Sequence, residues 1–401
     1  MTMSSSLALL VSIAGILALL RLKIHPGLAI FAGSLIISLL VLPLNSIPAH
    51  MLQSLLDRET LRLLVIIGSA LTLSSLMEEK GLLSRLASTM ESIGPKAALH
   101  LIPAVIGLVP MPAGALVSAT ASRDLVKRVG LNPEQSTFIN FWFRHIWEFS
   151  MPIYPAIIIT SVILSLPLFT VVKTLAPVSA LAIIAGGAVS YRILKNIPPV
   201  DAKPTKKIVY NLLRAAWPIL LLVPLILLGM DAMLAFPLTL LLLAVQQRAN
   251  WPELRKSLKY GADVKILFML YAIMLYKATI ESSGAASVLI TDMQTIGLPA
   301  AVMLVALPLL IGLATGISMA FAGITLPLLI PYILTDSGLN TYALLTAYVS
   351  GMMGLLLSPL HLCFILSAAY FQANLARMYR YLLPLTMTME AIVISIYLIT
   401  A

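Results

Sequence analysis

The chain has 401 residues, of which 60% are hydrophobic and 10% are charged. A typical soluble domain carries about 25% charged residues, so this composition excludes an ordinary soluble protein and indicates one that lies largely in lipid. The formal net charge is +10, and the single cysteine, Cys363, excludes an internal disulfide bond.

Apolar runs long enough to cross a bilayer recur along the whole chain, which is typical of a polytopic all-α membrane protein. The first run has no basic residue before it and precedes Arg21 and Lys23, so we interpret it as a retained span rather than a cleaved signal peptide. About ten transmembrane helices are expected, at residues 6–20, 26–44, 61–78, 135–165, 176–192, 209–229, 232–247, 264–283, 341–371 and 382–400.

Two further apolar stretches, at 97–125 and 299–334, are each interrupted near the middle by glycine or proline. We interpret both as re-entrant hairpins that enter and leave the membrane on the same side; two kinked single spans are the alternative. A hairpin tip in the membrane presents free backbone N–H groups and a positive helix end, which suit an anion. The candidate substrate-binding residues at the tips are Pro110, Met111, Pro112, Ala113 and Gly114 in the first hairpin, and Thr315, Gly316 and Ser318 in the second.

The predicted span at 135–165 contains a buried-charge candidate, Arg144. A charge at bilayer depth costs about 2.5–3.5 kcal/mol on insertion scales, and such residues usually serve a function. A guanidinium presents a fork of donors that matches a carboxylate. We therefore predict that Arg144 binds substrate, with Asn140 one helical turn earlier orienting it; the alternative is an internal ion pair with Glu148, four residues further on.

The same segment holds the candidates for ion coupling, His145, Glu148 and Ser150. Desolvation favours a neutral glutamic acid, and histidine exchanges protons near neutral pH. We predict proton coupling through His145 and Glu148. The alternative is a structural polar network that only satisfies buried groups.

The predicted span at 341–371 is the counterpart of this segment and is interrupted by Ser358, Pro359 and His361. It carries no charge that corresponds to Arg144 or Glu148, so the expected site is asymmetric. Ser358 and His361 are the candidate substrate-binding residues on this side. For His361 the alternative is a core histidine whose neighbours satisfy its hydrogen bonds.

Most of the 26 basic residues fall on one side of the membrane if the N- and C-termini lie outside and both hairpins return to their own side. This distribution agrees with the positive-inside rule. It also explains the net charge of +10 without any nucleic-acid partner.

An internal repeat underlies this pattern of spans. Glu78 matches Glu281 at an offset of 281 − 78 = 203, and Gly81, Met90 and Gly94 match glycine, methionine and glycine at the same offset. Each half carries five spans, an odd number, so the halves must lie inverted in the membrane, as in many secondary transporters. We divide the chain into a first inverted repeat at 1–192, a cytoplasmic linker at 193–208 and a second inverted repeat at 209–401.

The strings PMPAGAL, from Pro110, and NFWFRHIWE, from Asn140, followed by PIYP, resemble a prokaryotic integral-membrane family, domain of unknown function 401, along nearly the whole chain. That family is placed in the ion-transporter superfamily, and the order of spans, hairpin and broken span resembles the divalent-anion/sodium symporters and gluconate permeases. The resemblance implies a homodimer in the prokaryotic plasma membrane, with an elevator-like movement. The Ser-Asn-Thr motif of the dicarboxylate symporters is absent, so the resemblance by itself does not imply sodium coupling or dicarboxylate specificity.

These features together favour a secondary active transporter, a symporter, for a small anionic organic solute such as a carboxylate, driven by protons or sodium. The alternatives are an intramembrane enzyme that uses His145 and Glu148, and a channel lined by the two hairpins. The sequence has no P-loop motif of an ATPase, and its other histidines are scattered. We expect no catalytic residue, no cofactor and no resident metal; the partners are the solute, the coupling ion and the lipid.

Overall fold

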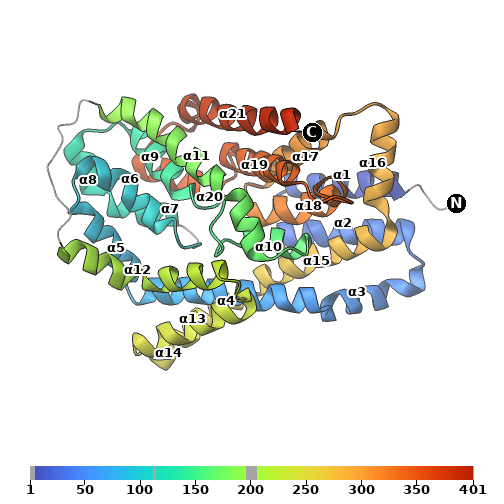
Figure 1. The fold of residues 1–401 in the computed structure, drawn as a ribbon, viewed down its shortest axis with the longest axis horizontal. Helices are drawn as coiled ribbons and strands as arrows, with labels where there is room; N and C mark the ends of the chain where they lie inside the picture. The colour runs from blue at the N-terminus through green and yellow to red at the C-terminus, as the bar shows by residue number, and fades with distance from the viewer. Residues whose placement is uncertain (1–4, 112–113, 196–205, 401) are drawn as a thin grey trace.

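The computed structural model describes residues 5–111, 114–195 and 206–400 (Figure 1). Pro112, Ala113 and residues 196–205 of the expected linker lie outside the described residues. The described chain is helical, except for turns and two short antiparallel strands, β1 (Leu334–Thr335) and β2 (Gly338–Leu339). The prediction of an all-helical fold is confirmed.

Among the described residues, those up to 195 form eleven α-helices and one short 3-10 helix, η1, and those from 206 to 400 form ten α-helices. The first half contains α1 (Ser5–Arg21), α2 (Pro26–Val41), η1 (Leu44–Ser46), α3 (Ile47–Leu56), α4 (Arg58–Glu79), α5 (Leu82–Glu91), α6 (Pro95–Ile106), α7 (Gly114–Ala121), α8 (Arg123–Val129), α9 (Pro133–His145), α10 (Pro155–Ile163) and α11 (Leu168–Leu194). The second contains α12 (Lys206–Leu227), α13 (Ala232–Gln246), α14 (Trp251–Gly261), α15 (Val264–Ser283), α16 (Ala285–Thr295), α17 (Ala300–Thr315), α18 (Ser318–Ile333), α19 (Thr341–Leu357), α20 (Leu362–Phe371) and α21 (Leu375–Thr400).

Several helices differ from the expected spans. Among the described residues, five segments are long and apolar enough to cross a membrane: α4, α11, α12, the stretch from α19 to α20, and α21. The predicted span at 135–165 is two helices, α9 and α10, separated by nine residues. The connections expected at 45–60 and 248–263 contain two helices, α3 and α14. α14 begins with a capping box at Asn250, a signal that the periodicity of apolar residues does not reveal.

The two halves pack across each other rather than side by side. α4 of the first half packs against α13 and α14 of the second, and α15 of the second half packs against α2 and α3 of the first. In Figure 1, α13 and α14 form one edge of the molecule, α21 forms the opposite edge, and α19 and α20 lie between them. The helices on either side of the two breaks, α9 and α10 and α19 and α20, therefore lie inside the molecule, where side chains from both halves meet.

Ion pairs fasten α14 to the end of α4. Lys80 Nζ lies 2.5 Å from Glu253 Oε2, and Lys256 Nζ lies 2.5 Å from Glu79 Oε2. The hydrogen bond from Lys80 lowers the pKa of Glu253, and the hydrogen bond to Glu79 raises the pKa of Lys256. Both groups of α14 are thus held in their charged forms.

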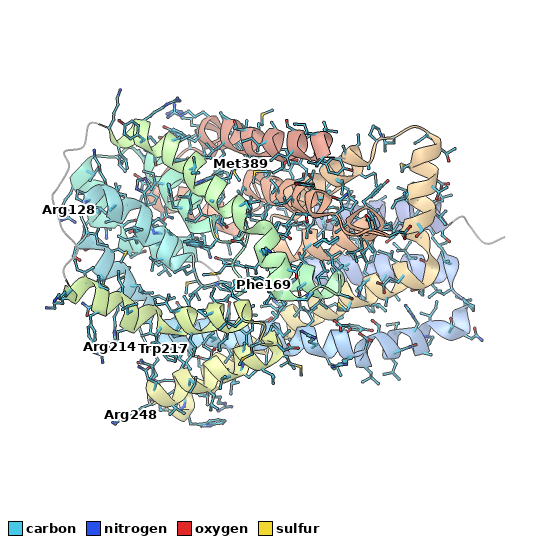
Figure 2. The ribbon with its side chains drawn as sticks, viewed as in Figure 1. Arg128, Phe169, Arg214, Trp217, Arg248 and Met389 are labelled. Carbon is cyan, nitrogen blue, oxygen red and sulfur yellow. The ribbon has the colours of Figure 1, made fainter. Side chains whose placement is uncertain are left out.

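The labelled basic residues Arg128, Arg214 and Arg248 lie toward the same end of the molecule, at the left of Figure 2. They come from α8, α12 and the turn between α13 and α14. The N-terminal end of the chain lies at the opposite end in Figure 1. These three arginines and the N-terminal end thus lie toward opposite ends of the long axis.

Each interrupted stretch packs onto a broken span through a glycine. A Cβ atom at Gly107, at the end of α6, would overlap the carbonyl oxygen of Arg144 on α9. A Cβ atom at Gly312 on α17 would overlap the carbonyl oxygen of Gly351 on α19. Glycine is required at both places because backbone approaches backbone.

Candidate functional site

The site is built around the break between α9 and α10. α9 ends at His145, and α10 begins only at Pro155, after Tyr154 as its N-terminal cap. Pro152 and Pro155 have no N–H group and cannot continue the helical hydrogen bonds. The break therefore places the charged residues Arg144 and Glu148 at an interrupted part of the helix, with exposed fractions of only 2% and 7%.

Arg144 uses only part of its hydrogen-bonding capacity. Its Nη1 donates to Glu148 Oε1 at 3.0 Å, and its Nη2 makes a long contact of 3.4 Å with the carbonyl oxygen of Met111. Its Nε is buried and has no hydrogen-bond partner among the described residues. A buried, unpaired donor on a charged group is costly and is normally satisfied by some acceptor.

The guanidinium lies against the start of α7. A Cβ atom at Gly114, the first residue of α7, would be 2.8 Å from Arg144 Nη2 and 2.9 Å from Nε. The N-terminus of a helix carries a partial positive charge and free N–H groups. Two positive groups therefore converge at this point, and Pro110 and Met111 adjoin them in the chain.

The second wall of the site comes from the other half of the chain. His361 is the N-terminal cap residue of α20, and its Nδ1 contacts the carbonyl oxygen of Gly316, in the turn between α17 and α18, at 2.8 Å. Its Nε2 lies 2.9 Å from Nε2 of His145. Ser358 donates to the carbonyl oxygen of Leu313 at 2.7 Å. The structure therefore places His361 and Gly316 beside His145, which follows Arg144 in the chain. All four residues were candidates for the site in the sequence analysis.

Other predicted residues lie nearby with different partners. Asn140 bonds the carbonyl oxygen of Ala115 and the hydroxyl of Ser367, each at 2.9 Å, and accepts from Ser118 at 2.7 Å, so it links α9 to α7 and α20. Thr315 donates to the carbonyl oxygen of Ile311 in α17 and accepts from the N–H of Ile317 in the turn before α18. Ser318 begins α18, and Ser150 pairs with Ser179 of α11 at 2.7 Å. Among the described residues, neither Asn140 nor Ser150 hydrogen-bonds the guanidinium itself, but Asn140 holds the start of α7 beside it.

Sequence reasoning missed several residues of the polar network. Tyr348 of α19 donates to the carbonyl oxygen of Glu148 at 2.9 Å, and Tyr154 donates to that of Gly107. Separately from this network, Glu390 of α21 accepts from Ser350 of α19 at 2.5 Å. Glu390 is a single carboxyl group in an otherwise apolar run, a signal that the sequence contains. The tyrosines carry no comparable signal.

A thiol completes the cluster but does not make it a metal centre. Cys363, His145 and His361 each place a ligand-type atom within 4.8 Å of the others. Two nitrogens on a tetrahedral zinc ion lie about 3.3 Å apart, which exceeds the 2.9 Å between the two histidines. The adjacent guanidinium of Arg144 also opposes a divalent cation. The residues present do not fit a metal ion in this arrangement.

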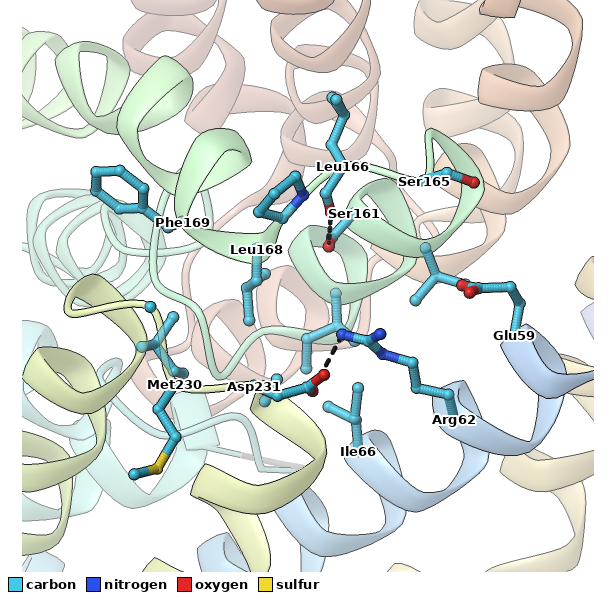
Figure 3. A pocket seen from close by; sticks show the side chains of 16 residues that line it. Glu59, Arg62, Ile66, Ser161, Ser165, Leu166, Leu168, Phe169, Met230 and Asp231 are labelled. Atoms are coloured by element: carbon cyan, nitrogen blue, oxygen red, sulfur yellow. Dashed lines mark hydrogen bonds and ion pairs between the residues drawn. The ribbon is translucent and has the colours of Figure 1, made fainter.

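A separate hollow of about 360 Å³ lies away from Arg144 (Figure 3). It is bounded by Glu59 and Arg62 of α4, by the turn after α10 and by Asp231. Arg62 and Asp231 form an ion pair at 3.0 Å across it. α10 runs from the break at Tyr154 to this hollow, a length of about 14 Å at 1.5 Å per residue.

The fold and the site define a class: a multi-pass, all-helical membrane protein with a transporter-like fold. The family model "Protein of unknown function (DUF401)" matches residues 3–400, so the chain belongs to this family. The chain is similar to the crystal structure of the YdaH transporter of Alcanivorax borkumensis, with a TM-score of 0.61, 13% sequence identity and coverage of 97% of both chains. At this identity the likeness shows the fold. The search of curated proteins gave no match.

Proposed function

We propose that the protein is a secondary active transporter, a symporter, of a small organic anion of the carboxylate type. The observation that carries this proposal is the buried Nε donor of Arg144, which has no partner among the described residues and lies against the start of α7. An anion held there would satisfy the donor and the positive end of the helix together. The transporter-like fold supports the same function.

Glu148 is the internal competitor for the same arginine. It holds Nη1 at 3.0 Å and thereby neutralises Arg144 while no solute is bound. A carboxylate that takes the place of the start of α7 beside Nη2 and Nε would form a bidentate pair with this edge of the guanidinium. We infer that the buried state is a closed, solute-free state in which Glu148 alone neutralises Arg144.

The proposal includes two inverted repeats, at 1–192 and 209–401, each with a re-entrant hairpin. In each half an interrupted stretch, α6–α7 or α17–α18, precedes a broken span, α9–α10 or α19–α20, and this recurrence supports the division. Pro103 and Gly107 of α6 stand at the same spacing as Pro308 and Gly312 of α17, and both glycines meet the backbone of a broken span. Inverted repeats with broken helices are typical of secondary transporters and carry their binding site where the repeats meet.

The proposal also includes a location and a movement. Basic residues toward one end of the molecule support a cytoplasmic side there, with both termini outside, in the plasma membrane of a prokaryote. The resemblance to the ion-transporter superfamily supports a homodimer and an elevator-like step in which α6, α7, α17 and α18 move with the bound solute. The coupling ion is a proton or sodium.

The test is thermal unfolding of the purified protein against carboxylates, sugar acids, phosphonates and neutral solutes. A ligand at about 100 times its dissociation constant adds about 2.7 kcal/mol of stability. We expect an anion to stabilise the wild type and Arg62→Ala, but not Arg144→Ala. Arg62 is the matched control, because it also pairs with a carboxylate at 3.0 Å, but at an exposed place. Stabilisation by neutral solutes alone, or its loss in Arg62→Ala only, would overturn the proposal.

A further inference from the structure

The contact between His145 and His361 has an unusual hydrogen balance. Their Nε2 atoms lie 2.9 Å apart. Each ring also bonds a backbone carbonyl through Nδ1, that of Phe141 at 2.5 Å for His145 and that of Gly316 at 2.8 Å for His361. A carbonyl oxygen only accepts hydrogen bonds, so both Nδ1 atoms carry hydrogen. In two neutral rings, both Nε2 atoms would then be bare acceptors that face each other at hydrogen-bond distance.

We propose that His145 and His361 share one additional proton between their Nε2 atoms, and that this pair is the seat of the coupling proton. With that proton, one ring donates and the other accepts, and 2.9 Å is an ordinary hydrogen-bond distance. The inference rests on the proposed transport function and names its coupling ion. It moves the proton from the expected pair of His145 and Glu148 to a pair that joins both halves of the chain.

His100 shows what a histidine with a balanced set of partners looks like. Like His145, it contacts through Nδ1 the carbonyl oxygen four residues earlier, that of Lys96, at 2.7 Å. Its Nε2 faces the hydroxyl of Ser190 at 2.8 Å, and a hydroxyl can donate. A neutral His100 is therefore satisfied without an additional proton. The comparison isolates the bare Nε2 as the special feature of His145 and His361.

The groups that face the pair determine its charge. Glu148 Oε1 lies 3.7 Å from His145 Nε2, and Arg144 pairs with the same carboxylate. Tyr348 and Tyr154 donate their hydroxyl hydrogens to carbonyl oxygens, so both are neutral. Cys363 contributes a buried thiol. With the shared proton, Arg144, Glu148 and the histidine pair sum to +1 − 1 + 1 = +1.

This sum links the proton to the solute. A net buried charge is unfavourable in a site that excludes water. A monoanion on Arg144 brings the sum to zero, so the anion favours the proton and the proton favours the anion, as reciprocal coupling requires. The geometry therefore points to symport of one proton with one monoanion.

The direct test observes the shared proton in the wild-type protein. Histidine labelled with ¹⁵N is introduced, and nuclear magnetic resonance spectra are recorded in lipid bilayers at pH 6, without any solute. We expect a correlation through a hydrogen bond between two imidazole nitrogens, retained in His100→Gln and lost in His361→Gln. The three other histidines face other groups, so the signal identifies this pair. Its absence from the wild type between pH 5 and 8 would overturn the proposal.

A second test follows stability against pH and also needs no solute. Below about pH 6.5 the two histidines bind two protons in the unfolded protein and one in the folded pair, so the contribution of the pair to stability rises with pH. Above about pH 6.5 the unfolded histidines lose their protons while the folded pair keeps one, so this contribution falls as the pH rises. The folding equilibrium constant then falls by a factor that approaches tenfold per pH unit. In His361→Gln the amide replaces the shared proton, so the fall above pH 6.5 disappears. His100→Gln keeps the fall.

The outcomes separate this inference from the proposed function. A wild type without the fall above pH 6.5 excludes the shared proton but leaves the anion site at Arg144 intact. Failure of every anion to bind removes the transport proposal but leaves the proton measurable. A third outcome would also overturn the inference: one zinc ion per purified wild-type molecule and none in His361→Gln or in Cys363→Ser. The cation between the two rings would then be a metal ion rather than a proton.

Discussion

Arg144 and Glu148 lie four residues apart across the end of α9 and form an ion pair of 3.0 Å with both side chains buried. In the same chain, Lys277 and Glu281 have the same spacing on α15, but their charged atoms are 3.7 Å apart and the Glu281 side chain is half exposed. Neither charge of the first pair reaches water, so each must be neutralised by the other, whereas in the second pair water reaches Glu281 although Lys277 is buried. The proposed function depends on this difference, because a buried arginine needs an anionic partner at all times, either Glu148 or a solute.

Glu148→Gln should strongly destabilise the protein. It leaves Arg144 charged, buried and without its counter-ion, and breaking a buried pair costs about 3–5 kcal/mol. A small carboxylate such as acetate should recover part of the loss, because it occupies the place that Glu148 leaves. Thermal unfolding with and without acetate measures both effects.

Glu281→Gln is the control for this prediction. Removing an exposed partner changes stability by less than about 1 kcal/mol, and acetate should have no added effect. Equal stability of Glu148→Gln and the wild type, or equal rescue of the two variants by acetate, would show that Arg144 does not need an anion.

Gly114→Ala should weaken anion binding. The added methyl group would lie 2.8 Å from Arg144 Nη2, so the guanidinium must move away from the start of α7. We expect a loss of about tenfold in affinity, or roughly 1.4 kcal/mol, measured by titration of the stabilising anion. Gly187→Ala on α11 is the control, since an added Cβ atom there meets no atom within 4 Å. Unchanged affinity in Gly114→Ala would separate α7 from the binding site.

Gly107→Ala and Gly312→Ala should destabilise the protein by similar amounts. In each variant a Cβ atom overlaps a backbone carbonyl of a broken span, and overpacking of this kind costs about 1–3 kcal/mol or more. Unfolding temperatures of the two variants compare the two halves directly. A large loss in one and none in the other would argue against equivalent positions in two repeats.

Tyr348→Phe should cost about 1–3 kcal/mol, because the carbonyl oxygen of Glu148 loses its donor in a buried place. Tyr342→Phe, at an exposed position on the same helix, should change stability little. Equal melting temperatures for the two variants would show that the hydroxyl of Tyr348 does not stabilise the break.

Much of the architecture was accessible from the sequence because apolar length and interruption by proline or glycine are local signals. They predicted the helical membrane fold and the interruptions within the stretches 97–125 and 299–334, where α6 ends before α7 and α17 ends before α18. Helices α3 and α14 were missed because they are short, and their starts depend on prolines and on the cap at Asn250. Periodicity over a long apolar window does not register such elements.

The site was predictable only in part. Arg144 stood out because a charge in an apolar run is costly, and Glu148 followed from helical spacing. The contact of His145 with His361 joins residues 216 positions apart, so only the packing of the two halves reveals it. The same holds for Tyr348, which reaches Glu148 across 200 positions.

The most direct test of the central claim is solute counterflow in proteoliposomes. Vesicles containing the protein are loaded with an unlabelled carboxylate that stabilises it, and entry of the labelled solute is followed. We predict saturable entry for the wild type and Arg62→Ala and none above empty vesicles for Arg144→Ala, provided that this variant is folded and inserted. Equal entry in Arg144→Ala and the wild type would contradict the assignment of Arg144 as the anion-binding residue.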